Sequence, residues 1–128
     1  GVHLGEDDGD LASARARLGA PAIIGVSCYD SLERARHFAA AGADYLAFGA
    51  FFPSPTKPHA RSATLDLLRD ARAFGKPLVA IGGITIDNAP SLIEAGADGV
   101  AAISALFNAE DVRVAAQAFA SLFDAARS

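Results

Sequence analysis

The chain has 128 residues, of which 52% are hydrophobic and 20% are charged, and its formal net charge at pH 7 is −4. This composition predicts one soluble domain with a hydrophobic core and excludes an intrinsically disordered chain. It also excludes a membrane-spanning helix, which needs about 20 consecutive apolar residues, and a strongly basic nucleic-acid-binding groove. The single cysteine, Cys28, excludes a disulfide scaffold and is typical of a reducing cytoplasm.

Five short apolar segments predict strands that are buried on both faces of a parallel sheet, because they lack polar alternation. They are residues 2–4, 22–26, 45–48, 78–81 and 100–103. Between them, apolar residues recur at spacings of three and four, as in Leu32, Ala35 and Ala39, which predicts amphipathic helices. The order strand then helix, repeated five times, predicts an α/β fold.

Boundary residues agree with these segments. Asp30, Thr85 and Asn108 are expected to cap the starts of three helices, since short polar side chains accept hydrogen bonds from free backbone N–H groups. Gly42 and Gly96 stand where helix ends need a left-handed residue.

An Ala-Gly-Ala-Asp motif occurs twice, at 41–44 and 95–98, and each copy joins a helix to a strand. Two architectures remain open at this point, an open doubly wound sheet and a segment of a (β/α)₈ barrel. No shift in composition marks a second domain within residues 1–128.

Ligands of parallel α/β proteins bind at the carboxyl ends of the strands, so the residues there are candidates for chemistry. Glu6, Asp7 and Asp8 follow the first strand and are either Mg²⁺ ligands or a solvated acidic turn. Ser27 is either a ligand contact or a helix cap. Cys28 is interpreted as a packing residue, because no neighbour in the sequence would lower its pKa.

The loop after the third strand is more informative. Ser54, Thr56 and Lys57 supply two hydroxyls and an ammonium between prolines, which suits a phosphate, although an ordinary surface loop has the same composition. The Gly-Gly pair at 82–83 and Ser104 follow the last two strands, where barrels often bind phosphate. His3 and His37 are interpreted as structural residues.

Five motifs in this order resemble the thiamine-phosphate synthase family, and the resemblance covers the whole chain. They are residues 1–5, 25–27, 53–58, 81–84 and 99–104. The resemblance implies a (β/α)₈ TIM barrel of which residues 1–128 form the C-terminal part, approximately strands four to eight with their helices. The first three strands of the family's barrel would then be absent from this chain.

The resemblance also implies an activity. The family couples hydroxymethylpyrimidine diphosphate to a thiazole phosphate, which yields thiamine monophosphate and pyrophosphate, with Mg²⁺, in the cytoplasm. Carried over by motif, Asp8 would bind Mg²⁺, and Ser27 and Lys57 would bind the pyrimidine diphosphate and act in catalysis. The remaining implied contacts, all to the thiazole phosphate, are Ser54, Pro55, Thr56, Gly83, Ile103 and Ser104.

The sequence departs from the family pattern at three places. Glu6 stands where Gln is usual, Ser54 where Thr is usual, and Tyr29 where His is frequent. A thiazole tautomerase-like isomerase of the same fold is one alternative, which Tyr29 and the Thr-Lys-Pro motif at 56–58 disfavour. A non-catalytic phosphate-binding fragment is the other, and we expect the 128 residues on their own to be incomplete and inactive.

Overall fold

The computed structural model describes residues 1–53 and 62–127, in which five parallel strands form one sheet in chain order. The strands are β1 (Val2–Leu4), β2 (Ile24–Tyr29), β3 (Tyr45–Phe48), β4 (Leu78–Ile81) and β5 (Gly99–Ala101). The helices are α1 (Leu11–Leu18), α2 (Leu32–Ala40), α3 (Leu65–Ala71) with a 3₁₀ turn η1 (Arg72–Phe74), α4 (Ala89–Ala95), α5 (Ser104–Phe107) and α6 (Val112–Arg127). The predicted α/β fold with a parallel sheet is therefore confirmed.

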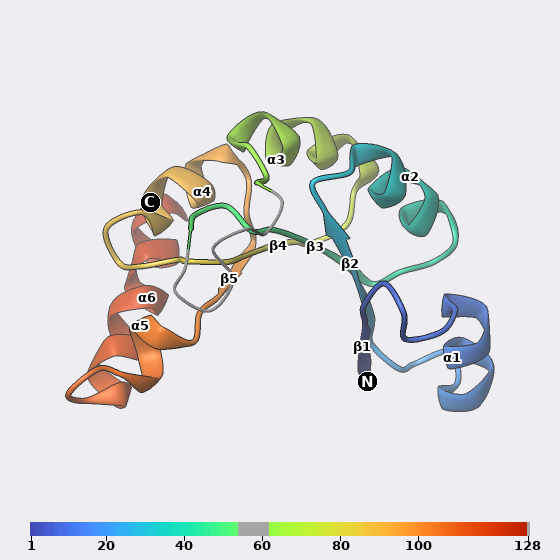
Figure 1. The fold of residues 1–128 in the computed structure, drawn as a ribbon, viewed down its shortest axis with the longest axis horizontal. Helices are drawn as coiled ribbons and strands as arrows, with labels where there is room; N and C mark the ends of the chain where they lie inside the picture. The colour runs from blue at the N-terminus through green and yellow to red at the C-terminus, as the bar shows by residue number, and fades with distance from the viewer. Residues whose placement is uncertain (54–61, 128) are drawn as a thin grey trace.

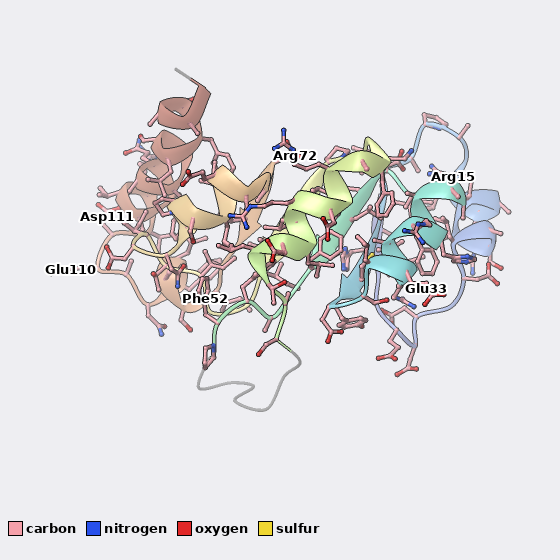
Figure 2. All side chains as sticks on the ribbon, turned by 90° about the horizontal axis from the view of Figure 1, so that it is seen from above. Arg15, Glu33, Phe52, Arg72, Glu110 and Asp111 are labelled. Atoms are coloured by element: carbon pink, nitrogen blue, oxygen red, sulfur yellow. The ribbon has the colours of Figure 1, made fainter. Side chains whose placement is uncertain are left out.

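The sheet is curved, and the helices fan over its outer side (Figure 1). Seen from that side, α2, α3 and α4 lie next to one another across the strands (Figure 2). None of the helices in the described residues is both long and apolar enough to cross a membrane.

Alternate residues of each strand face opposite sides of the sheet, which separates two environments. One set packs under the helices and forms the hydrophobic core, with Ile24, Val26, Leu46, Phe48 and Leu78 at most 1% exposed. The other set lines the inner side of the curve, where Figure 1 shows no helix within the described residues. These inner-face residues include His3, Ser27, Tyr45, Val79 and Ala101, as the strand register shows.

The repeated Ala-Gly-Ala-Asp motif closes the amino end of the sheet. Asp44 accepts a hydrogen bond from the backbone N–H of Ile24, and Asp98 accepts one from the N–H of Leu78, each through Oδ2 at 2.8 and 2.9 Å. Each aspartate also donates its own N–H to the carbonyl of the same partner residue. The side chain therefore extends the strand ladder by one bond and satisfies a backbone donor at the strand start.

Several predicted boundaries are wrong. Ser31 caps α2 in place of Asp30, and Asp111 accepts the N–H bond at the start of α6 in place of Asn108. Thr85 lies in the turn before α4 rather than at its cap. β2 continues past its predicted end at 26, and the chain leaves β5 before 103, because the length of a strand depends on its neighbour in the sheet.

Asp44 differs from Asp98 because an arginine side chain, that of Arg15, hydrogen-bonds its carboxylate. The Arg15 guanidinium hydrogen-bonds the Asp44 carboxylate at 2.8 Å and, with the Ile24 N–H bond, holds the pKa of Asp44 below its ordinary value. Because Asn can keep the backbone bond but not the charge, Asp44→Asn should lower the free energy of unfolding at pH 7. The measurement is urea unfolding of the protein at its full natural length.

The sign of the pH dependence follows from the lowered pKa. The stabilisation is present above the ordinary aspartate pKa and is lost as the pH falls through the lower pKa of the folded state, so wild type and Asp44→Asn should converge in acid. Asp98→Asn is the matched control, since Asp98 makes the same backbone bond. An equal, pH-independent loss in both variants would contradict the role of Arg15.

Candidate active site

The acidic segment after β1 is anchored to the neighbouring strand. The Asp8 carboxylate accepts a hydrogen bond from the backbone N–H of Gly5 through Oδ2 at 2.7 Å. The N–H of Glu6 donates to the hydroxyl of Tyr29 at 2.9 Å, and Tyr29 is the last residue of β2. These bonds hold the turn that carries Asp8 against the carboxyl end of β2. The turn after β1 and the end of β2 therefore lie at the same edge of the sheet.

The end of β2 is itself irregular. The register with β3 shifts between Ser27 and Tyr29, and Tyr29 adopts a positive φ of 55°, which is uncommon for a non-glycine residue. Arg34 of α2 donates through Nε to the carbonyl oxygen of Ser27 at 2.7 Å, and its guanidinium lies 5.7 Å from the centroid of the Tyr29 ring. Arg34 therefore contacts the residues on both sides of this shift, the backbone of Ser27 and the ring of Tyr29.

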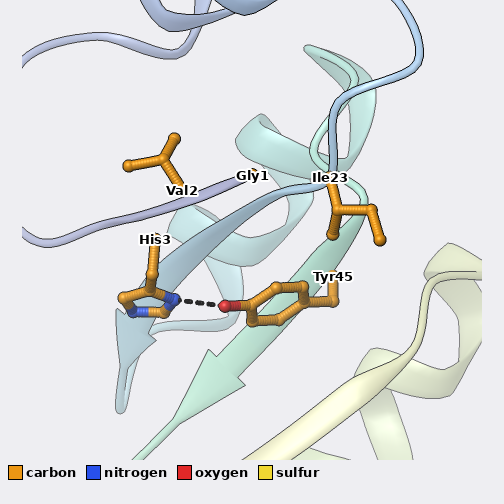
Figure 3. Close-up of a pocket in the computed structure, with 5 residues that line it drawn as sticks. All are labelled: Gly1, Val2, His3, Ile23 and Tyr45. Carbon is orange, nitrogen blue, oxygen red and sulfur yellow. Dashed lines mark hydrogen bonds between the residues drawn. The ribbon is translucent and has the colours of Figure 1, made fainter.

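Ser27 is not a helix cap. It is 8% exposed, and its hydroxyl lies 2.7 Å from Nε2 of His3 on β1. The other ring nitrogen of His3, Nδ1, lies 2.7 Å from the hydroxyl of Tyr45 on β3 (Figure 3). A hydrogen-bonded chain thus joins three strands on the inner face of the sheet.

Sequence reasoning missed His3 and Tyr45 as members of this group. His3 is exposed on the inner face and is not buried in the core, so its interpretation as merely structural is incomplete. The parallel register brings these residues together, because it places His3 beside Gly25 and Gly25 beside Tyr45. Register is a tertiary property, and five strands of unknown alignment do not define it.

The loops after β3 and β4 are locked together. The N–H groups of Phe51 and Phe52 donate to the carbonyls of Ile81 and Gly82 at 3.3 and 3.2 Å. Gly83 has a φ of +66°, and a Cβ at this position would lie 2.6 Å from the carbonyl oxygen of Phe52. Phe52 lies at the edge of the sheet where these loops emerge (Figure 2).

This contact also locates the start of the predicted phosphate loop. Pro53 is the last described residue before it, and its carbonyl oxygen would lie 2.9 Å from a Cβ at Gly83. Ser54, Pro55, Thr56 and Lys57 lie outside the described residues. Asn88 donates through Nδ2 to the carbonyl of Gly83 at 3.0 Å and so holds the glycine turn from the other side.

Ile103 and Ser104 lie beyond β5, the neighbour of β4. Ile103 is 77% exposed, and Ser104 begins the four-residue helix α5. Among the described hydrogen bonds, none joins Ser104 to Gly83, so these two predicted contacts share an edge of the sheet without a direct bond.

Two further predictions concern Cys28 and the metal. Cys28 is fully buried in the hydrophobic core, as expected of a packing residue, and burial raises the pKa of its thiol to about 11. In the part of the chain that the structure describes, no group of three or more His, Cys, Asp or Glu side chains is arranged to hold a metal ion.

The fold and the position of these loops define the class of protein. Parallel α/β proteins of the TIM-barrel type gather their functional loops at the carboxyl ends of the strands, and the candidate residues of this chain follow its strands in the same way. A 3-hexulose-6-phosphate synthase structure has the same fold, with a TM-score of 0.65 at 20% identity over 94% of this chain and 60% of that one.

Closer relatives show the family. Residues 1–106 match the family model described as thiamine monophosphate synthase, and the chain belongs to that family. It is 60% identical to a thiamine-phosphate synthase of Chromobacterium violaceum, over 98% of this chain and 60% of the relative. The Azoarcus sp. (strain BH72) thiamine-phosphate synthase is 63% identical, over 96% of this chain and 60% of the relative.

A solved structure agrees. The thiamine phosphate pyrophosphorylase of Pyrococcus furiosus has a TM-score of 0.85 at 41% identity, over 98% of this chain and 59% of that one. The chain therefore spans about 60% of the length of the curated relatives that it matches.

The lock between the two loops predicts the effect of Gly83→Ala. The positive φ alone costs a non-glycine residue about 1–2 kcal/mol, and the Cβ would also overlap the backbone of Phe52. We expect a larger loss of unfolding free energy than this strain alone, measured by urea unfolding.

Gly75→Ala is the matched control. Gly75 has a similar φ of +70°, and nothing lies within 4 Å of its Cβ position. Gly75→Ala should lower the free energy of unfolding only by the cost of the positive φ. An equal loss in the two variants would show that the two loops are not in close contact in solution.

Proposed function

We propose that the protein is a thiamine-phosphate synthase, a transferase of thiamine biosynthesis that acts in the cytoplasm. It would couple hydroxymethylpyrimidine diphosphate to thiazole phosphate and release pyrophosphate. The packing of Gly83 against Phe52 and Pro53 carries this proposal, because it brings the glycine turn to the start of the Ser-Pro-Thr-Lys loop. Membership of the family supports it.

The thiazole phosphate would bind between the loops that follow β3, β4 and β5. Hydroxyls and backbone N–H groups are suitable donors to a phosphate, and glycine lets the backbone approach closely. The residues proposed for this subsite are Ser54, Pro55, Thr56, Gly83, Ile103 and Ser104. Ile103 and Ser104 are both exposed at this edge.

The pyrimidine diphosphate would bind beside β1 and β2. Ser27 would donate its hydroxyl to the diphosphate, and Lys57 would place an ammonium against the charge that develops there. The bond between the pyrimidine methylene carbon and oxygen breaks, and the diphosphate leaves with the electron pair. The thiazole nitrogen then supplies the electron pair for the new C–N bond. The ammonium of Lys57 would stabilise the diphosphate as the C–O bond breaks.

Asp8 suits a Mg²⁺ ion bound mainly by phosphate oxygens. Its carboxylate is exposed, and the Gly5 N–H occupies only Oδ2 among the described contacts. Mg²⁺ in such sites takes one or two carboxylates together with substrate oxygens and water, so a full cage of protein ligands is not needed. Bound there, Mg²⁺ would neutralise diphosphate charge, and the Gly5 and Tyr29 contacts would keep Asp8 in place.

We further propose that residues 1–128 correspond to the C-terminal part of the barrel, approximately strands four to eight. In the described sheet, β1 and β5 are each paired on one side only, and no described helix lies on the inner face. The 128 residues on their own are accordingly proposed to be inactive.

Lys57→Ala tests the proposed activity. In the protein at its full natural length, formation of thiamine monophosphate from the two phosphorylated substrates should fall by about a hundredfold to a thousandfold, the loss typical of removing a group that stabilises developing charge. Lys76→Ala is the control, because Lys76 precedes β4 at the opposite end of the strands. No product from the folded wild-type protein would overturn the proposed function itself.

Asp8→Asn tests the metal. The Mg²⁺ concentration that gives half-maximal activity should rise by about tenfold or more, since even outer-shell changes weaken metal binding by that amount. Asp10→Asn makes the same charge change two residues away, at the cap of α1, where Asp10 accepts the N–H of Ser13. Equal Mg²⁺ dependence in the two variants would rule out Asp8 as the ligand.

A further inference from the structure

The proton of the Ser27 hydroxyl can rotate about the Cβ–Oγ bond, so its direction depends on its hydrogen-bonding partner. Its residue is buried in β2, and Arg34 holds its carbonyl oxygen at 2.7 Å. Within the described residues, its hydroxyl has one hydrogen-bonding partner, Nε2 of His3. The state of His3 therefore decides whether the Ser27 proton points into the protein or toward a ligand.

His3 is held at both ring nitrogens. Nδ1 lies 2.7 Å from the Tyr45 hydroxyl, and Nε2 lies 2.7 Å from the Ser27 hydroxyl. The His3 and Tyr45 rings are stacked with centroids 5.6 Å apart, which fixes the orientation of the imidazole. Figure 3 shows the Tyr45 ring reaching from the start of β3 toward His3.

A neutral imidazole has one N–H donor and one acceptor nitrogen. The two hydrogen bonds that join Tyr45, His3 and Ser27 can therefore point in either of two directions. In the first, Nδ1–H donates to Tyr45, and Ser27 uses its only proton to donate to Nε2. In the second, Tyr45 donates to Nδ1, and Nε2–H donates to the Ser27 oxygen. Only the second leaves the Ser27 proton free to donate to an anion.

Gly25 keeps the path for this chain open. A Cβ at Gly25 would overlap the Tyr45 ring, so the ring reaches across β2 toward His3 only because this position has no side chain. Glycine inside a strand weakens the strand, and its use here marks a close approach of another group. The glycine, the stacked rings and both hydrogen bonds all serve the same arrangement.

We infer that Tyr45 and His3 are positioning residues that fix the Ser27 hydroxyl as a donor to the diphosphate of the substrate. Tyr45 donates to Nδ1 of His3, and this bond holds the Nε2–H tautomer, which donates to Ser27. The Ser27 proton is then directed at a phosphate oxygen. The inference rests on the proposed function, since it assigns the direction of a hydrogen bond at that same site.

The tautomer is the first test and does not depend on activity. The ring ¹⁵N resonances of His3, assigned by comparison with His3→Asn, should show a protonated Nε2 and an unprotonated Nδ1 in wild type. Tyr45→Phe should shift the population toward the other tautomer, whereas Tyr29→Phe, which removes the other tyrosine hydroxyl of the chain, should leave it unchanged. A protonated Nδ1 in the wild-type protein would overturn the inference.

Kinetics of the protein at its full natural length are the second test. Tyr45→Phe should lower kcat/KM for the pyrimidine diphosphate by about tenfold, the size of one oriented hydrogen bond, with KM for the thiazole phosphate unchanged. In a Ser27→Ala background the same change should cost nothing further, because Tyr45 acts through Ser27. Additive losses would show a merely structural role and overturn the inference.

Two outcomes separate this inference from the proposed function. If folded wild type forms no thiamine monophosphate, the proposed function fails, and the His3 tautomer still decides the direction of the chain. If wild type is active but Tyr45→Phe has normal kinetics and an unchanged tautomer, only this inference fails. Gly25→Ala, which displaces the Tyr45 ring without removing a hydrogen-bonding group, should reproduce the Tyr45→Phe tautomer shift, with circular dichroism confirming that each variant is folded.

Discussion

Each strand from β2 to β5 pairs in parallel with the strand that precedes it in the chain, and the arrangement of the site depends on this constraint. Parallel pairing requires a crossover between strands, and here the helical crossovers lie on the outer side of the curve (Figure 1). The carboxyl ends of the strands then meet along one edge, and the inner-face side chains of neighbouring strands come within hydrogen-bonding distance. The Asp8 turn and the Gly83 turn both follow strands at that edge, and the Ser27 hydroxyl meets His3 of the neighbouring strand.

Different interactions occupy the two ends of the strands. At the amino end, Asp44 and Asp98 satisfy the first backbone donors of β2 and β4, and so stabilise the sheet. At the carboxyl end, hydrogen bonds between neighbouring segments hold the Asp8 turn and the loops that follow β3 and β4. The chain from Tyr45 through His3 to Ser27 connects the two ends, because it begins at the first residue of β3 and finishes near the end of β2.

The fold was largely predictable, because runs of buried aliphatic residues and helical spacing are local signals. All five strands were located, although the limits of β2 and β5 were displaced, since the end of a strand depends on the strand beside it. Caps were less predictable. Asp30 and Ser31 are adjacent and both suit a helix start, and only the geometry of the turn selects Ser31.

The site was predictable as a set of segments and not as an arrangement. The sequence by itself determined the parallel α/β class, the packing role of Cys28 and the family resemblance, because these depend on residue type and order along the chain. Only the tertiary structure decided that His3 lies between Ser27 and Tyr45, and that Gly25 and Gly83 make room for a ring and a loop. Those contacts join residues up to 42 positions apart, and strand register, which no local pattern specifies, brings them together.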